Sequence, residues 1–333
     1  MGAHRTRPSG VGRSRRNRYL VGAAAILAIS AILLSLVASA GRPRRTTTHQ
    51  RAETSQPQSS SRLQPRDLRV LASGASRSFE RLRAELPGRV EIAVTPLGEG
   101  QATVLGGNTP AQGWSVTKVP VLIALMKAHA DLGEPALSRS ERALAHSAIT
   151  ESDNQSILQL FSALEKLDSG LAGASRAVEA VLRLGGDADT TVTTAPPPPG
   201  AVTTFGQTPW SASAAATFFR AFADGCLLSA ADTGYLLGLM REIVPSESWG
   251  LGSGGFASIA FKGGWGPDPA GRYLVRQSGI IDSRSFGGVS VSIVAFPASG
   301  SFTDGTAIVT RAAQWLHREL RLTPREKPSC RNG

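Results

Sequence analysis

Cysteine, histidine and lysine are scarce in this chain of 333 residues, and their scarcity narrows the kinds of site it can hold. The two cysteines, Cys226 and Cys330, have neither metal-ligand spacing nor the setting of a catalytic thiol. The five histidines form no HExxH motif. We therefore predict no metal site and no cofactor. Whether the cysteines form a disulfide stays open, because the bond depends on a geometry that the sequence does not show.

Acidic residues are almost absent from residues 1–67, and this absence explains the basic character of the whole chain. The formal net charge is +11, yet residues 1–67 contribute +10 of it, with twelve arginines, no lysine and only two acids. The remainder of the chain, with 24 basic and 23 acidic residues, is almost neutral. The bulk charge is therefore no evidence for nucleic-acid binding, and no nucleic-acid partner is expected.

Charge of either sign is missing from residues 19–40, which follow a segment, 1–18, with six arginines and no acid. Twenty-two helical residues span about 33 Å, which is enough to cross a bilayer core. The arginines predict a cytoplasmic N-terminus, so the rest of a single-pass cell-membrane protein would lie outside the cytoplasm. Alternatively, residues 38–40 (Ala-Ser-Ala) fit the cleavage site of a signal peptide, and cleavage after Ala40 would yield a secreted protein.

Residues 41–66 are polar and rich in Arg, Thr, Gln, Ser and Pro, which predicts a disordered tether. A folded domain is expected over 67–321, followed by a loose tail over 322–333. Helices are expected at 67–86, 115–130, 138–150, 153–166, 174–184, 211–223, 229–242 and 304–320, and strands at 90–95, 102–105, 257–262, 272–281 and 288–296.

The order of these elements indicates a mixed α/β (α+β) fold. Tight turns between consecutive strands favour an antiparallel five-stranded sheet. Helices from both ends of the domain would flank one face, and the block of helices between the second and third strands would form an all-helical subdomain beyond the other. A long irregular segment is expected over 185–210.

Three short motifs follow one another along the domain: Ser115-Val116-Thr117-Lys118, Ser152-Asp153-Asn154 and Lys262-Gly263-Gly264-Trp265. Two of the five lysines fall within them. The first and third motifs are weak signals alone, but Ser-Asp-Asn is rare in a chain with 11 Asp and 4 Asn. Their order, each on a suitable predicted element, points to a serine nucleophile.

The chemistry of acyl transfer explains this set of residues. Lys118 lies one helical turn from Ser115 and can take its proton if burial or a nearby cation lowers the lysine pKa. Lys262 can be that cation, and Ser152 can link the two lysines and relay a proton. Asn154 offers an amide to a peptide-like substrate. The backbone N–H groups of Ser115 and Trp265 are candidate donors to an oxyanion.

The set resembles the motifs of the penicillin-recognising serine enzymes, and specifically the class A β-lactamase-like family. AITESDNQSILQLF and SASAAATFFRAFADGCLLS also resemble helices of that family, so the likeness covers about 67–321. It implies that Ser115 is acylated, that Lys118 is its base, that Ser152 shuttles a proton and that Lys262 is a partner of the substrate carboxylate and an electrostatic partner. It also implies a substrate-binding set: Asn154, Gly264, Trp265 and, for a carboxylate, Arg272 or Arg276.

The chain departs from the family pattern in three places. Ser115 and Ser152 are 37 residues apart, which is fewer than is typical and predicts a more open cleft. Gly263 stands where a hydroxyl residue is usual. The segment 185–210, which corresponds to the omega loop, contains no Glu; a proline near Pro196 takes its place, and Asp187 and Asp189 are its only carboxylates.

These observations lead to two hypotheses of different kinds. The first is an exported, membrane-tethered serine hydrolase or acyl-transferase that forms an acyl-enzyme with β-lactam or peptidoglycan-peptide substrates. It would deacylate slowly, because no omega-loop glutamate activates water. The second is a non-catalytic protein of the same fold that binds cell-wall peptides or a protein partner.

Overall fold

The computed structural model describes residues 70–98, 100–283, 287–321 and 330. The predicted basic segment, membrane segment and tether, at 1–18, 19–40 and 41–66, lie outside these residues, as does the tail over 322–333 apart from Cys330. Within the described part of the chain, no helix is both long and apolar enough to cross a membrane.

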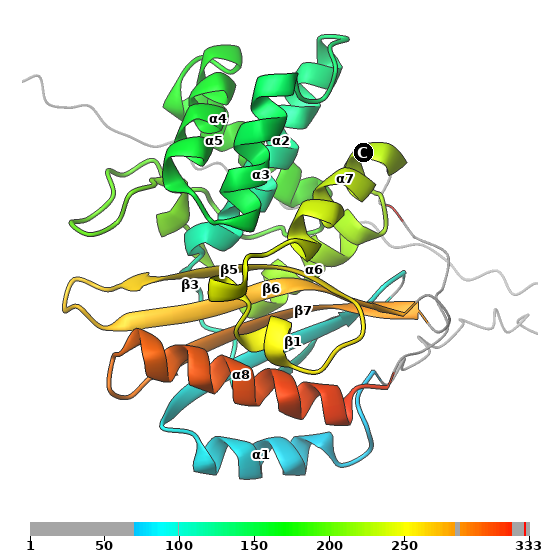
Figure 1. Ribbon diagram of the computed structural model, residues 1–333, viewed down its shortest axis with the longest axis vertical. Coiled ribbons are helices and arrows are strands. Elements are labelled where there is room, and N and C mark those ends of the chain that lie inside the picture. Colours follow the sequence, from blue (N-terminus) through cyan, green and yellow to red (C-terminus); the bar gives the residue numbers. More distant parts are fainter. Residues whose placement is uncertain (1–69, 99, 284–286, 322–329, 331–333) are drawn as a thin grey trace, which may run out of the picture. The chain divides into compact units, whose positions relative to one another are not determined.

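Five antiparallel strands form the central sheet, in the order β2-β1-β7-β6-β5 (Figure 1). Their bounds are Gly88–Pro96 (β1), Thr103–Leu105 (β2), Ile259–Pro267 (β5), Tyr273–Ser283 (β6) and Gly287–Pro297 (β7). The predicted antiparallel five-stranded sheet is thus confirmed. Because β5 is an edge strand, its outer side is available to pack against a different part of the chain.

Alternate side chains of β1 show how the two faces of the sheet are covered. Ile92 and Val94 belong to an apolar cluster with helices α1 (Ala75–Glu85) and α8 (Phe302–Glu319). Ala93, between them, packs in a different cluster with residues of α6 (Ala212–Ala223). The period of two along the strand therefore sends one set of side chains to each layer of helices. Figure 1 shows α1 and α8 together on one side of the sheet.

The remaining helices form the predicted helical subdomain on the other side (Figure 1). They are α2 (Lys118–Asp131), α3 (Arg139–Thr150), α4 (Asn154–Leu167), α5 (Leu171–Leu184) and α7 (Ala230–Arg241). Helix α2 is buried all around over its first nine residues. It lies at the centre of the largest apolar core, with α4, α5 and the phenylalanines of α6 around it.

The observed bounds differ from the predicted ones at several elements. The first helix begins at Ala75, because Gly74, directly before it, takes a left-handed φ of 95°. Residues Trp114–Thr117 form a 3-10 turn (η1) before α2. Strand β5 continues to Pro267, beyond its predicted end at 262. Two short strands, β3 (Ala111–Gln112) and β4 (Pro209–Trp210), were not predicted.

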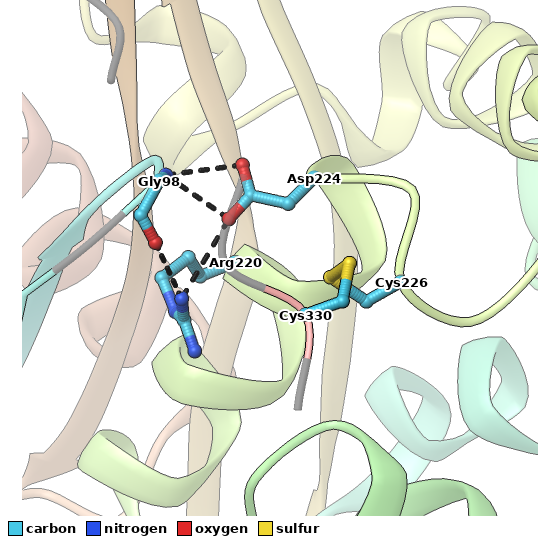
Figure 2. The surroundings of a disulfide bond; sticks show 5 residues. All are labelled: Gly98, Arg220, Asp224, Cys226 and Cys330. Carbon is cyan, nitrogen blue, oxygen red and sulfur yellow. Dashed lines mark hydrogen bonds and ion pairs between the residues drawn. A yellow bond between two sulfur atoms is a disulfide. The ribbon is translucent and has the colours of Figure 1, made fainter. Parts of the chain in front are cut away.

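A disulfide joins Cys226, after α6, to Cys330, with Cα atoms 5.2 Å apart (Figure 2). The adjoining end of α6 is also fixed to the turn after β1. The N–H of Gly98 donates to both carboxylate oxygens of Asp224, at 3.1 and 3.0 Å, and Arg220 donates to the carbonyl of Gly98 at 2.6 Å. Cys330, which we expected in a loose tail, is therefore bonded to the folded domain.

Candidate active site

Ser115 lies in the 3-10 turn η1, directly before the buried helix α2. The turn starts from Trp114, whose φ of 46° is unusual for a residue with a side chain. The hydroxyl of Thr117 donates to the carbonyl of Trp114 at 2.6 Å and holds this conformation. Ser115 itself is half-buried and lines a cavity. Among the described residues, none forms a hydrogen bond with its Oγ.

Lys118, the first residue of α2, points its ammonium group at the Ser-Asp-Asn motif. Its side chain is fully buried, and its Nζ donates to the carbonyl of Ser152, to the carbonyl of Asp153 at 3.2 Å and to Ser152 Oγ at 3.5 Å. Burial, and then the charge of Lys262, lowers the pKa of Lys118 to about 7. A lysine with this pKa is partly neutral near pH 7 and can accept a proton.

Lys262, on β5, approaches the same serine from the sheet. Its Nζ donates to Ser152 Oγ at 2.8 Å and to the carbonyl of Gly263 at 3.0 Å. Burial lowers the pKa of Lys262 to about 8, and the Glu247 carboxylate, 3.7 Å from Nζ, opposes this shift. Ser152 thus lies between the two lysine ammonium groups, in the arrangement that the spacing of the motifs predicts.

Backbone strain and a helix cap fix the Ser-Asp-Asn motif. Ser152 has a φ of 56°, and Asp153 caps α4 by accepting a hydrogen bond from the N–H of Ser156 at 2.6 Å. Hydrogen bonding to the side chain of Ser156, and then to its backbone N–H, lowers the pKa of Asp153. Asn154 begins α4 and lines the same cavity as Ser115. Strained residues of this kind persist where the surrounding structure fixes them, and they concentrate at functional sites.

Gly264 allows β5 to lie directly against the turn that carries Ser115. A Cβ atom at position 264 would lie 2.9 Å from the backbone nitrogen of Ser115 and 3.0 Å from that of Val116. Gly266 has the same relation to the ring of Trp114, since a Cβ atom at position 266 would lie 2.2–2.4 Å from three of its carbons. The glycines of β5 therefore bring the strand edge and the serine turn together.

A cavity of about 190 Å³ opens beside Ser115. Its lining comes from the serine turn, α4, the segment after the prolines, the end of β5 and the start of β6: Trp114, Ser115, Asn154, Gly200, Val202, Thr203, Trp265, Gly266, Pro267 and Tyr273. Trp265 is held by Trp249 and Phe302, with ring centroids 5.8 and 5.3 Å away. The cavity thus has an aromatic wall fixed by packing from behind.

The two arginines expected to hold a substrate carboxylate lie elsewhere. Arg272 is 72% exposed and forms an ion pair with Asp268 at 2.9 Å, at the turn before β6. Arg276 is completely buried, and its Nη1 donates to the carbonyls of Ala111, Gln112 and Trp210 at 3.1, 3.3 and 2.9 Å. Burial lowers the pKa of Arg276 to about 10. The structure places neither guanidinium in the lining of the cavity.

One carboxylate of the 185–210 segment, that of Asp187, holds the loop itself. Asp187 is 2% exposed; its oxygens accept hydrogen bonds from the N–H of Thr190 at 3.1 Å and from Trp210 Nε1 at 2.8 Å. Asp189 and Pro196 are exposed and do not line the cavity beside Ser115. Neither carboxylate of this segment therefore belongs to the described lining of the cavity.

Glu247 is a site residue that was not predicted from the sequence. It ends the 3-10 turn Pro245–Glu247, between α7 and β5, and brings a half-buried carboxylate to Lys262. No motif or spacing marks it in the sequence, because it is a single acid in an irregular connection. Only the turn after α7 places it behind the lysine.

No family model matches the sequence, and no curated protein matches it either. Solved structures do match. The class A β-lactamase of the last common ancestor of Gram-negative bacteria has 20% identity and a TM-score of 0.57, covering 74% of this chain and 99% of its own. A β-lactamase from Chitinophaga pinensis has 18% identity and a TM-score of 0.57, covering 73% of this chain and 98% of its own. At this level of identity the likeness concerns the fold, and the chain therefore has the fold of class A β-lactamases.

Proposed function

We propose that the protein is a serine hydrolase or acyl-transferase whose Ser115 is acylated by β-lactam or peptidoglycan-peptide substrates. The observation that carries the proposal is the buried link from Lys118 through Ser152 to Lys262, with 2.8 Å between Ser152 Oγ and Lys262 Nζ. Burying three polar side chains in mutual contact beside the half-buried Ser115 costs free energy of folding. Such a cluster therefore favours a functional role over a purely structural one.

The acylation step uses each of these groups. Neutral Lys118 takes the proton of Ser115 Oγ, and the oxygen bonds to the substrate carbonyl carbon. The oxyanion is stabilised by the backbone N–H groups of Ser115 and Trp265. The carbon–nitrogen bond then breaks, and the leaving nitrogen receives a proton from the Lys118 ammonium through Ser152. The acyl group remains as an ester on Ser115.

Release of the acyl group requires water and a base. The carboxylate of Asp187 is occupied by backbone and indole donors, and 185–210 contains no glutamate. A general base accelerates such a step by a factor of about 10²–10⁴. Without one, the acyl-enzyme is expected to be long-lived. The enzyme would then be labelled readily and turn over slowly.

The location of the protein is part of the proposal. The uncharged segment 19–40 would hold the chain in the membrane, or be cleaved after Ala40, with the domain outside the cytoplasm. The disulfide between Cys226 and Cys330 supports an oxidising compartment. Mass spectrometry of the mature N-terminus decides between the two forms: a chain that starts at Gly41 has lost the segment.

A second function, binding without catalysis, is favoured by one observation: Ser115 Oγ has no hydrogen-bond partner among the described residues. In that case cell-wall peptides or a protein partner would occupy the cavity without reacting. The protein's biological effect would then survive Ser115→Ala.

The test uses the full chain with a fluorescent penicillin, followed by intact-protein mass spectrometry. The expected result is a stable adduct on the wild-type chain that is absent from Ser115→Ala. Ser162→Ala is the matched control, because Ser162 is also half-buried, on α4, and its side chain has no hydrogen bond within the described part of the chain. An unlabelled wild-type chain, beside a labelled control enzyme, would favour the non-catalytic function.

A further inference from the structure

The cavity beside Ser115 has no charged side chain in its described lining. Three of its ten lining residues are aromatic (Trp114, Trp265 and Tyr273), and Val202 and Pro267 add apolar surface. Its polar side chains are the hydroxyls of Ser115, Thr203 and Tyr273 and the amide of Asn154. Such a lining suits an aromatic or branched apolar group, and taking a carboxylate out of water into it is costly.

None of the cations near the cavity belongs to its described lining. Lys262 donates to Ser152 and Gly263, and Glu247 balances its charge from 3.7 Å. Arg276 is completely buried; its Nη1 donates to backbone carbonyls, whereas its Nε and Nη2 have no hydrogen-bond partner among the described residues. Arg272 is paired with Asp268 outside the cavity. Lys118 is buried against the carbonyls of Ser152 and Asp153.

A hydroxyl that could assist is also missing at the strand edge. Position 263 is glycine, and a Cβ placed there would meet the ring of Trp249 at 3.4 Å and that of Trp265 at 3.6 Å. The space next to Gly263 is thus bounded by aromatic rings. Because Trp249 and Phe302 support Trp265, this wall is fixed before a substrate binds.

We infer that the site selects its acyl donor by an uncharged aromatic or apolar group seated against Trp265 and Tyr273, and that it does not recognise a carboxylate on the donor. The inference rests on the proposed acylation of Ser115. It narrows the substrate class to acyl donors that carry an apolar group next to the reacting carbonyl. Any carboxylate on such a donor is dispensable, so a donor whose carboxylate is esterified or amidated should also react.

Two matched comparisons test this inference on the full chain. Benzylpenicillin and its methyl ester differ only in the free carboxylate. Benzylpenicillin and 6-aminopenicillanic acid differ in the phenylacetyl group. We expect the second-order rate of Ser115 acylation, followed by intact mass, to be at least as high for the ester as for the acid. We expect it to be at least about tenfold lower without the phenylacetyl group.

A tenfold or greater loss of rate on esterification would overturn the inference, as would equal rates with and without the phenylacetyl group. Arg272→Ala gives a second check, since this exposed arginine can be changed without touching the cavity. In Arg272→Ala, the acylation rate with the ester divided by that with the acid should equal the wild-type ratio. A higher ratio in this variant would show that Arg272 holds the carboxylate.

Failure of the proposed acylation gives a different result, because no compound would then add mass to Ser115. In that event the same compounds are titrated against Ser115→Ala by quenching of tryptophan fluorescence, since Trp114 and Trp265 line the cavity. Equal or tighter binding of the ester supports the inference without any catalysis. Binding of the acid that is tenfold tighter contradicts it.

Discussion

Ser152 Oγ accepts a hydrogen bond from Lys262 Nζ at 2.8 Å, although 110 positions separate the two residues in the chain. Lys118 Nζ lies on the other side of the same hydroxyl, at 3.5 Å. One serine therefore connects the helical subdomain to the edge strand of the sheet.

Ser152→Ala removes the hydroxyl between the two lysines and leaves both ammonium groups in place. We expect the rate of Ser115 acylation to fall by about 10²–10⁴, as for the loss of a proton-transfer group. Ser147→Ala is the control, because Ser147 is half-buried on α3 and its hydroxyl forms no hydrogen bond with any described residue. Equal labelling of the two variants by a fluorescent penicillin would show that Ser152 does not relay the proton.

Acylation should depend on pH within a narrow window. Lys118 acts as a base only when neutral, so the rate rises as pH increases through its pKa of about 7. Lys262 supplies charge only when protonated, so the rate falls as pH increases through its pKa of about 8. A bell-shaped profile with a maximum between these values is expected from stopped-flow labelling over a range that extends well beyond both.

Glu247→Gln tests the same assignment. The carboxylate of Glu247 raises the pKa of both lysines, so its loss lowers both values and moves both limbs of the profile to lower pH. Movement of one limb alone would assign the other limb to a different group. A rate that stays constant across the whole range would contradict the role of both lysines.

Gly264→Ala should damage the site, whereas Gly263→Ala should be tolerated. A methyl group at 264 would lie 2.9 Å from the backbone nitrogen of Ser115, but at 263 it would meet ring carbons at 3.4 Å or more. Overpacking of this kind costs about 1–3 kcal/mol. We expect Gly264→Ala to lower the melting temperature and the acylation rate, and Gly263→Ala to remain close to the wild-type protein in both. Similar behaviour of the two variants would refute the close approach of β5.

The disulfide should contribute stability without affecting the chemistry. Cys226 and Cys330 are separated by 104 positions, and the chain-entropy estimate for a loop of this order is about 4.7 kcal/mol. Reduction should lower the melting temperature of the wild-type chain and leave its acylation rate at room temperature unchanged. The Cys226→Ser, Cys330→Ser double variant should melt at the lower temperature with or without reductant. A melting temperature that does not respond to reductant would mean that the bond does not form in solution.

The sheet, the helical subdomain and the three motifs could be predicted because their signals are periodic or chemically rare. The end of β5 was placed too early because glycines at 263, 264 and 266 lower strand propensity. Pairing with β6 over the whole of β5 overrides that local preference. The partners of Arg276 could not be predicted, since its acceptors come from β3 and β4, which are too short to give a periodic signal. Glu247 and the cysteine pairing depend on tertiary contacts that no local pattern encodes.

The pairing of β1 with β7 also sets an order of events for the chain. β1 ends at Pro96, and the sheet joins it to a strand that begins at Gly287, so the domain cannot close until nearly all of its sequence is present. Pairing strands this distant in sequence requires the chain between them to lose loop-closure entropy before the contacts stabilise the fold. Such contacts therefore form late and slowly. Lys262 belongs to β5, which the sheet joins to β1 through β6 and β7, so we expect its position beside Ser115 to depend on that assembly. A chain still emerging from the ribosome would therefore have Ser115 without Lys262 beside it, and the candidate site would exist only in molecules that have finished folding.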